Sequence, residues 1–207
     1  MTDDSRRKKP RQARSKATVD AIVEATGQVF TDGGFRRTST TRVAERAGVS
    51  VGSLYQYFPD KKALIAAFFE RRLEQEAVWA ERIAARDDLR ASPRALITGA
   101  TEEMLRLYRE DRALYRGVVE ALPLMEQTPE VQAGLARMVG LIAMSLASFP
   151  DMLRGRDPEL LATMVFHGLR GAMNAVLARA PDKLDDPHLL DVLVGGALGM
   201  LGIDDLA

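Results

Sequence analysis

Apolar residues recur at helical spacing along almost the whole chain, and no segment shows the alternation that is typical of a β-strand. The first helical stretch is marked by Val19, Ile22, Val23, Val29 and Phe30, and the pair Gly33-Gly34 follows it. Glycine readily adopts the positive φ with which many helices end. The pattern therefore predicts a first helix that ends near residue 33.

Two short apolar patterns lie on either side of Gly48. Ser39 or Thr40 is suited to cap the first and Ser50 the second, because their hydroxyl groups accept hydrogen bonds from free N–H groups at a helix start. Pro59 ends the second pattern. The arrangement predicts a helix-turn-helix unit, whose second helix can lie in the major groove of DNA.

Longer helical patterns fill the rest of the chain. One runs from residue 61 to about 85, the next begins at Ser92-Pro93, and another covers residues 111–122. Proline is well tolerated at the first position of a helix, so three more starts are expected, at Thr128-Pro129, Asp157-Pro158 and Asp186-Pro187. The total of about nine helices predicts an all-α protein.

The charge of the chain is unevenly distributed. Of 207 residues, 46% are hydrophobic and 28% are charged, as in a globular protein. The net charge is zero, but residues 1–62 carry 13 Lys and Arg against 7 Asp and Glu, a net charge of +6 that the remainder balances. This asymmetry indicates that one end meets a polyanion. Residues 1–13 are expected to form a disordered basic arm, which either follows DNA or is a solubilising tail.

Several classes of site and location are not expected from the composition. Because there is no cysteine, disulfides and thiolate metal sites are absent and a reducing compartment fits. The basic N-terminus is not followed by the apolar region of a secretory signal. The longest nearly uncharged stretch, residues 189–203, contains Asp191 and is too short for a bilayer. We expect a cytoplasmic protein without a membrane partner.

Catalytic patterns are also missing from the sequence. The only histidines, His167 and His188, stand on different predicted helices without metal-ligand spacing, and no glycine-rich phosphate loop occurs. Glu102 and Glu103 are adjacent, so on a helix they point in different directions. We therefore expect neither an enzyme nor a cofactor or metal site.

Polar residues remain on the helix-turn-helix unit after its apolar positions, Val51, Leu54 and Phe58 among them, are assigned to the core. Hydroxyl and amide groups bind phosphates and base edges, and the amide of Gln56 can pair bidentately with adenine. A lysine at a helix start, Lys61, is disfavoured by the helix dipole unless a phosphate lies nearby. Tyr55 is either a DNA contact or half buried in the core. The expected DNA contacts are Thr40, Ser50, Gly52, Ser53, Tyr55, Gln56, Tyr57 and Lys61.

The segment "FTDGGFRRTSTTRVAERAGVSVGSLYQYFPDKKALIAAF", residues 30–68, resembles the DNA-binding domain of the TetR family of bacterial regulators. The matching positions are Phe30, Gly34-Phe35, Thr38, Val43-Ala44, Ala47-Gly48-Val49-Ser50, Gly52, Leu54-Tyr55, Tyr57-Phe58, Lys61 and Leu64. The resemblance covers about residues 14–70. Val51 differs, because many relatives carry lysine or arginine there, and one phosphate contact is thereby lost.

The resemblance implies an all-helical homodimer, usually a repressor of a palindromic double-stranded operator that a small molecule releases. Residues 14–60 would be the DNA-binding domain and residues 61–207 the helical domain for ligand binding and dimerisation. A transcriptional activator of the same architecture is an alternative. A helical ligand carrier that does not bind DNA is a second one, and would use its basic arm on membranes.

Two faces in the second half of the chain are candidates for dimerisation and ligand binding. Small residues on one side of the helix at 158–179 and an apolar final helix predict a dimer interface of Gly168, Gly171, Ala172, Ala175, Leu193, Ala197 and Leu201, with a purely internal core as the alternative. The expected pocket, for a largely apolar effector, comprises Met104, Tyr108, Phe166, His167, Arg170, Met173 and Asn174. Arg170, if buried, needs an anionic or carbonyl partner. That partner is either a ligand or an internal carboxylate, Glu102, Glu103 or Glu120, and exposure of Arg170 to solvent is the alternative. For the methionine and aromatic residues the alternative is ordinary core packing.

Overall fold

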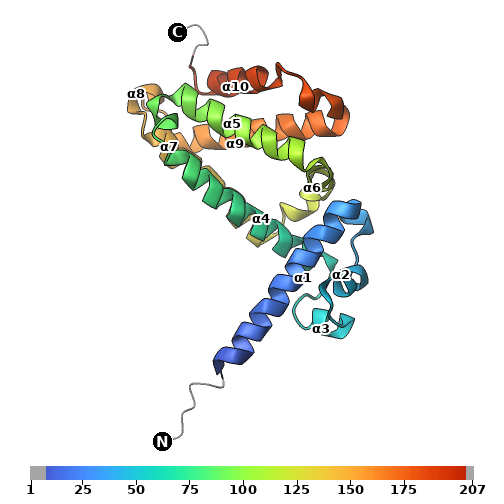
Figure 1. Ribbon diagram of the computed structural model, residues 1–207. Coiled ribbons are helices and arrows are strands. Elements are labelled where there is room, and N and C mark those ends of the chain that lie inside the picture. The colour runs from blue at the N-terminus through green and yellow to red at the C-terminus, as the bar shows by residue number, and fades with distance from the viewer. Residues whose placement is uncertain (1–7, 204–207) are drawn as a thin grey trace, which may run out of the picture.

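The computed structural model describes residues 8–203, and within this range all regular secondary structure is helical, as Figure 1 shows. The fold class is therefore confirmed as all-α. The ten α-helices are α1 (Lys8–Arg37), α2 (Thr40–Ala47), α3 (Val51–Tyr55), α4 (Lys61–Ala84), α5 (Pro93–Glu110), α6 (Arg112–Met125), α7 (Pro129–Ala147), α8 (Pro150–Leu153), α9 (Pro158–Arg179) and α10 (Leu189–Met200), with 3-10 turns η1 (Leu89–Ala91) and η2 (Pro181–Asp185).

Helix α1 is longer at both ends than the sequence pattern predicts. It begins at Lys8, so the expectation of a disordered arm is wrong for residues 8–13, while residues 1–7 lie outside the described residues. The predicted break at the glycine pair is present as a kink at Gly34, which has φ 64° and ψ −171°. One more helical turn follows, and its last residue is Arg37.

The short helices α2 and α3 begin at the caps that the sequence predicts. The Ser39 hydroxyl accepts a hydrogen bond from the Arg42 amide at 3.3 Å, and the Ser50 hydroxyl accepts one from the Ser53 amide at 3.0 Å. Gly48 ends α2 in the left-handed conformation with φ 67°. Local side-chain chemistry thus fixes both boundaries of the turn between the two helices.

One hydrophobic core joins the helix-turn-helix unit to the rest of the molecule. Phe30 of α1 is fully buried, and its ring centre lies 5.6 Å from that of Phe68 and 5.7 Å from that of Phe69, both on α4. The same cluster includes Leu54 of α3 and Leu114 of α6. The first turns of α4 therefore pack as part of the N-terminal unit, and α6 rests against it.

The C-terminal half is a bundle in which α10 lies beside α5 and α9, at the end of the molecule away from α3 (Figure 1). Leu193, Ala197 and Leu201 are 5%, 1% and 0% exposed, and they pack inside this bundle. Their predicted place in the dimer interface is therefore wrong, because side chains buried within the chain cannot contact a partner. An almost uniformly apolar helix does not reveal which of its sides faces inward.

Helices α7 and α9 are long and apolar enough, by length and composition alone, to cross a membrane. In the structure they pack against each other. Val139 and Leu146 of α7 share a buried cluster with Leu161 and Val165 of α9. Their apolar composition is thus accounted for in part by the core of the bundle.

Candidate DNA-binding surface and ligand cavity

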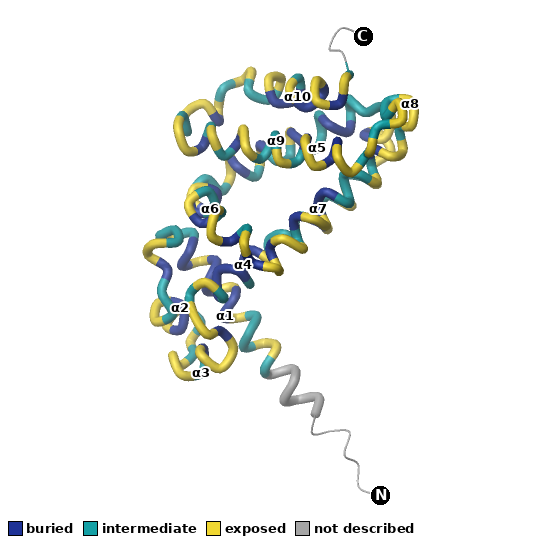
Figure 2. Tube along the Cα trace, turned by 180° about the vertical axis from the view of Figure 1, so that it is seen from behind, coloured by how far each residue is buried: buried dark blue, intermediate teal, exposed yellow. Residues whose placement is uncertain are grey.

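The outward side of α2 and α3 is polar, and Figure 2 shows α3 exposed over most of its length. Leu54 is fully buried beneath it. Val51 was expected in the core, but it is 37% exposed, so that assignment is wrong. Tyr55 is 51% exposed and Tyr57 is 36% exposed, so neither ring is a core residue. Gln56 is exposed beside them.

Hydroxyl groups connect this surface to the neighbouring helices. The Tyr55 hydroxyl lies 3.2 Å from Oγ1 of Thr40, at the start of α2. The Ser15 hydroxyl of α1 donates a hydrogen bond to the Tyr57 hydroxyl at 3.4 Å. The remaining expected contacts sit at the start of α3, where Ser50 and Gly52 are exposed. Seven of the eight expected contact positions, all but Lys61, thus lie on the helix-turn-helix unit, with Thr40 at the start of α2.

Lys61 has an intramolecular partner that the sequence argument did not include. Its Nζ donates a hydrogen bond to the Phe35 carbonyl at 3.1 Å and lies 4.2 Å from the centre of the Phe35 ring. Phe35 belongs to the last turn of α1, where carbonyl groups favour a cation. A phosphate is therefore not needed to explain a lysine at the start of α4.

A cavity of about 200 Å³ lies between α4, α5, α6, α7 and α9, and most of its lining is apolar. Five of the seven predicted ligand-binding residues line it: Met104, Tyr108, Phe166, Arg170 and Asn174. The prediction is wrong for His167, which is exposed, and for Met173, which is fully buried in a neighbouring core cluster and does not line the cavity. The predicted ligand-binding residues of α9 are thus divided among the cavity, the solvent and the core.

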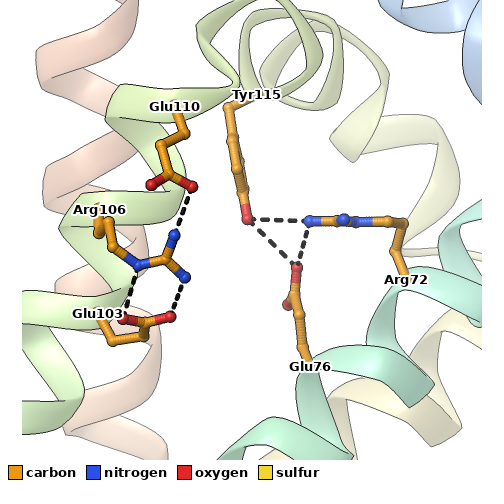
Figure 3. Close-up of polar contacts among 6 residues, drawn as sticks. All are labelled: Arg72, Glu76, Glu103, Arg106, Glu110 and Tyr115. Atoms are coloured by element: carbon orange, nitrogen blue, oxygen red, sulfur yellow. Dashed lines mark hydrogen bonds and ion pairs between the residues drawn. The ribbon is translucent and has the colours of Figure 1, made fainter.

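A polar cluster in the cavity wall was not predicted: Arg72 and Glu76 of α4 with Tyr115 of α6 (Figure 3). The Arg72 Nη2 atom lies 3.4 Å from Glu76 Oε1 and 3.4 Å from the Tyr115 hydroxyl, which donates to the same carboxylate oxygen at 3.3 Å. Burial raises the pKa of Glu76, and Arg72, Tyr115 and Arg170 oppose the rise. The signal was present in the sequence, because both α4 residues continue the apolar stripe of Phe68 and Phe69 at helical spacing.

Tyr108 connects this cluster to α9. Its ring is stacked on that of Tyr115, with the ring centres 4.0 Å apart, and its hydroxyl donates to Asn174 Oδ1 at 2.7 Å. Burial, followed by the proximity of Tyr115 and Glu76, raises the pKa of Tyr108, so the hydroxyl stays protonated. Polar groups from α4, α5, α6 and α9 therefore form one continuous part of the cavity wall.

Arg170 pairs with a carboxylate other than those the sequence suggested. Its Nη2 donates to Oε1 of Glu126, the residue that follows α6, at 2.5 Å and lies 3.3 Å from Nδ1 of His167. Burial and the nearby Arg170 charge lower the pKa of His167, which favours the neutral ring. The pair joins α9 to α6 while the arginine also borders the cavity.

Two family models together account for most of the chain. The model described as bacterial regulatory proteins of the tetR family matches residues 17–68, and the model of the tetracyclin repressor-like C-terminal domain matches residues 92–201. The protein belongs to the TetR family. It is accordingly a DNA-binding transcriptional regulator of the helix-turn-helix type.

Named relatives and solved structures agree with this membership. A helix-turn-helix transcriptional regulator of Mycobacterium tuberculosis is 27% identical over 177 residues, which cover 74% of this chain and 93% of the relative. SmeT, the repressor of the Stenotrophomonas maltophilia multidrug efflux pump SmeDEF, is 25% identical with a TM-score of 0.61, over 88% of this chain and 87% of SmeT. FadR of Bacillus subtilis, solved with stearoyl-CoA, shares the fold with a TM-score of 0.64 at 19% identity, over 87% of this chain and 96% of FadR.

The solvent-facing side of α9 and α10 in this TetR regulator includes several exposed apolar and small residues. Leu160 and Met164 of α9 are 58% and 47% exposed, and Val192 of α10 is 68% exposed. Gly171 of α9 and Gly196 of α10 have open space where a side chain would stand.

No group of three or more potential metal ligands occurs among residues 8–203.

Proposed function

We propose that this TetR regulator is a transcriptional repressor that binds a two-fold symmetric operator as a homodimer and dissociates when a small molecule fills the cavity. The observation that carries the proposal is the exposed polar side of α3, which stands over a buried Leu54 and is held by hydroxyl contacts to α1 and α2. The named function of SmeT as a repressor supports the direction of regulation.

Each exposed group on this surface has a role on DNA. Gln56 reads a base edge, since its amide presents a donor and an acceptor side by side. The hydroxyls of Tyr55 and Tyr57 bind phosphates, because they lie at the edge of the surface and are already oriented by Thr40 and Ser15. Gly52 lets the backbone of α3 approach a phosphate closely, as it carries no side chain.

A homodimer gives the operator its symmetry. The exposed sides of α9 and α10 form the proposed interface, in which Gly171, Ala172 and Ala175 face the partner and Gly168 packs against Met200 of its own chain. A side chain at Gly168 would stand 2.7 Å from the Met200 Cε atom, so this glycine serves the α9–α10 contact. Two helices from each chain would bury apolar groups that the monomer exposes.

Two helices of the cavity wall also contact the DNA-binding unit. Helix α4 carries Arg72 and Glu76 in the cavity wall and Phe68 against Phe30 of α1. Helix α6 carries Tyr115 in the same wall, two residues before Gly117, which lies against Phe30. A ligand that favours another arrangement of α4 and α6 would change the distance between the two α3 helices of the dimer, and affinity for DNA follows the population of each state.

Transcription from a single promoter tests the proposal. DNA bound by the protein is first selected from a random pool, and the selected site is placed between a promoter and a reporter. Purified protein should reduce transcript from this template and leave the same promoter without the site unchanged. Increased transcript would show an activator, and an equal effect on both templates would contradict operator binding.

A further inference from the structure

The polar end of the cavity has hydrogen-bond donors that no group within residues 8–203 uses. Nη2 of Arg72 makes both of that residue's contacts, so its Nε and Nη1 retain free N–H groups. Arg170 likewise binds Glu126 and His167 through Nη2 alone. Asn174 accepts from Tyr108 through Oδ1, which leaves its NH₂ group. A ligand that enters here meets donors from α4 and from α9.

The charged residues that line the cavity also suit a ligand with a negatively charged acceptor group. Arg72, Arg170 and Glu76 are its charged lining residues within the described chain, so the lining carries a net charge of +1 when Glu76 is ionised. Glu126 lies outside the lining but pairs with Arg170 and balances its charge, so Arg72 is the arginine available to a ligand. Burial favours protonation of Glu76, the carboxylate that pairs with Arg72, and a protonated Glu76 would leave Arg72 without a counter-charge. A negatively charged group on a ligand then supplies that counter-charge, whereas a cation would oppose Arg72.

These donors lie close together because aromatic contacts connect them. The Tyr115 hydroxyl accepts a hydrogen bond from Arg72, and the Tyr115 ring is stacked on the Tyr108 ring. The Tyr108 hydroxyl in turn donates a hydrogen bond to Asn174. The rest of the wall is mostly apolar, with Ile97 of α5, Leu135 of α7 and Val165 of α9 among its residues, and two hydroxyl groups, those of Thr101 and Ser145, interrupt it. The cavity is therefore suited to a molecule with one acceptor group at one end and a hydrocarbon body at the other.

From this arrangement we infer that the effector is a small carboxylic acid with an apolar tail. Its carboxylate binds Arg72, with Asn174 as a second donor, because a guanidinium and a carboxylate form paired, charge-assisted hydrogen bonds. The inference rests on the proposed function only in taking the cavity as the effector site. It assigns the ligand's chemical class and the residues that recognise it.

The size of the cavity limits the tail. An apolar cavity of about 150 Å³ in another protein holds benzene, so about 200 Å³ accommodates roughly eight to ten non-hydrogen atoms. Octanoate has this size. Three octyl compounds with other head groups, octanamide, 1-octanol and octylamine, share its tail and differ from it only in the polar group.

Binding of these four compounds to the full chain tests the inference, with calorimetry and the fluorescence of Trp79, which lines the cavity and is the chain's only tryptophan. Octanoate should bind at least about tenfold more tightly than octanamide or octanol at pH 7.5, and octylamine should bind most weakly. Equal or tighter binding of any of the other three would overturn the inference. Failure of all four compounds to bind would overturn it as well.

Matched variants identify the recognising residues. Arg72→Met should weaken octanoate binding at least about tenfold and change octanol binding by less than about threefold, because it removes the guanidinium group and keeps an apolar side chain of similar length. Arg82→Met, on an exposed position of the same helix, should leave both unchanged. Circular dichroism checks that each variant is folded. Should Arg72→Met not fold, Asn174→Leu serves instead, with the same direction of change. Wild-type affinity for octanoate in the folded variant would contradict the inference.

A separate measurement distinguishes this inference from the proposed function. The calorimetry experiment measures binding of the compound to the protein without DNA. Fluorescence anisotropy of a labelled operator measures release of the operator from the protein. Octanoate that binds selectively but leaves the operator complex intact would support the inferred ligand class and contradict effector-controlled repression. Release of the operator by octylamine but not by octanoate would support the function and contradict the inferred class.

Discussion

The contact between α6 and α1 is close enough that a single methyl group should disturb it. A Cβ atom at Gly117 would stand 2.9 Å from Cε1 and 3.2 Å from Cζ of Phe30, and 3.4 Å from the Gly34 Cα. Phe30 is fully buried between Phe68 and Phe69, so its ring cannot move aside cheaply. Gly117→Ala therefore overpacks the core, which costs about 1–3 kcal/mol in similar cases.

A second effect of the same substitution has the opposite sign. Alanine stabilises the interior of a helix relative to glycine by about 1 kcal/mol, because glycine loses more backbone freedom on folding. Gly140 lies within α7 with no atom within 4 Å of the added methyl position, so Gly140→Ala shows this gain without the clash. The difference between the two variants isolates the steric cost, which we expect to be about 1–3 kcal/mol.

Urea unfolding at one fixed protomer concentration measures this difference, with Trp79 fluorescence and circular dichroism as probes. Gly117→Ala should have the lower free energy of unfolding. It should also change the effector concentration at which half the operator is released, whereas Gly140→Ala should not. If Gly117→Ala is as stable as Gly140→Ala and releases operator at the same effector concentration as the wild type, α6 does not press on α1 as described.

Three further predictions concern the DNA surface, the dimer and the cavity. Gln56→Ala should relax the preference at one operator position by roughly 1–3 kcal/mol, whereas Tyr57→Ala should weaken binding to most sequences alike, as a randomised operator library measures. Met164→Glu should yield monomers in sedimentation velocity because it places an unpaired charge in the interface, and Met144→Glu, on a 71% exposed position of α7, should leave the dimer intact. Burial raises the pKa of Glu76 above its ordinary 4.5, so the folded chain binds a proton there more readily than the unfolded chain. The wild type should therefore lose stability relative to Glu76→Gln as pH rises from 4.5 through the raised value, and an equal difference in urea midpoint at pH 4 and pH 8 would exclude this.

The helix-turn-helix unit was predictable because local chemistry determines it. The serine caps at residues 39 and 50 and the left-handed Gly48 depend on neighbours within a few residues, so the sequence contains the whole signal. The starts of α7 and α9 at Pro129 and Pro158 follow the same principle. The unpredicted turn of α8 and the last turn of α1 depend on tertiary packing instead, because Leu153 and Phe35 pack against buried clusters.

The cavity and the dimer face required the tertiary structure. Arg170 and His167 are three residues apart on one helix and were predicted to share a function, yet one borders the cavity and the other faces solvent. Helix α10 is apolar on nearly every side, so its pattern could not tell buried Leu193 from exposed Val192. Arg72 and Glu76 continue the apolar stripe of α4, but only the tertiary structure shows that α6 places Tyr115 against them.

Selection of bound DNA from a random pool tests the central claim most directly, because the protein itself chooses the operator sequence. The purified protein at about 0.15 M salt should enrich a motif of two inverted half-sites, and the Gln56→Ala protein should enrich the same half-site spacing with one position relaxed in each half. A pool that shows no enrichment with well-folded dimeric protein would contradict the assignment of α3 as the helix that reads DNA.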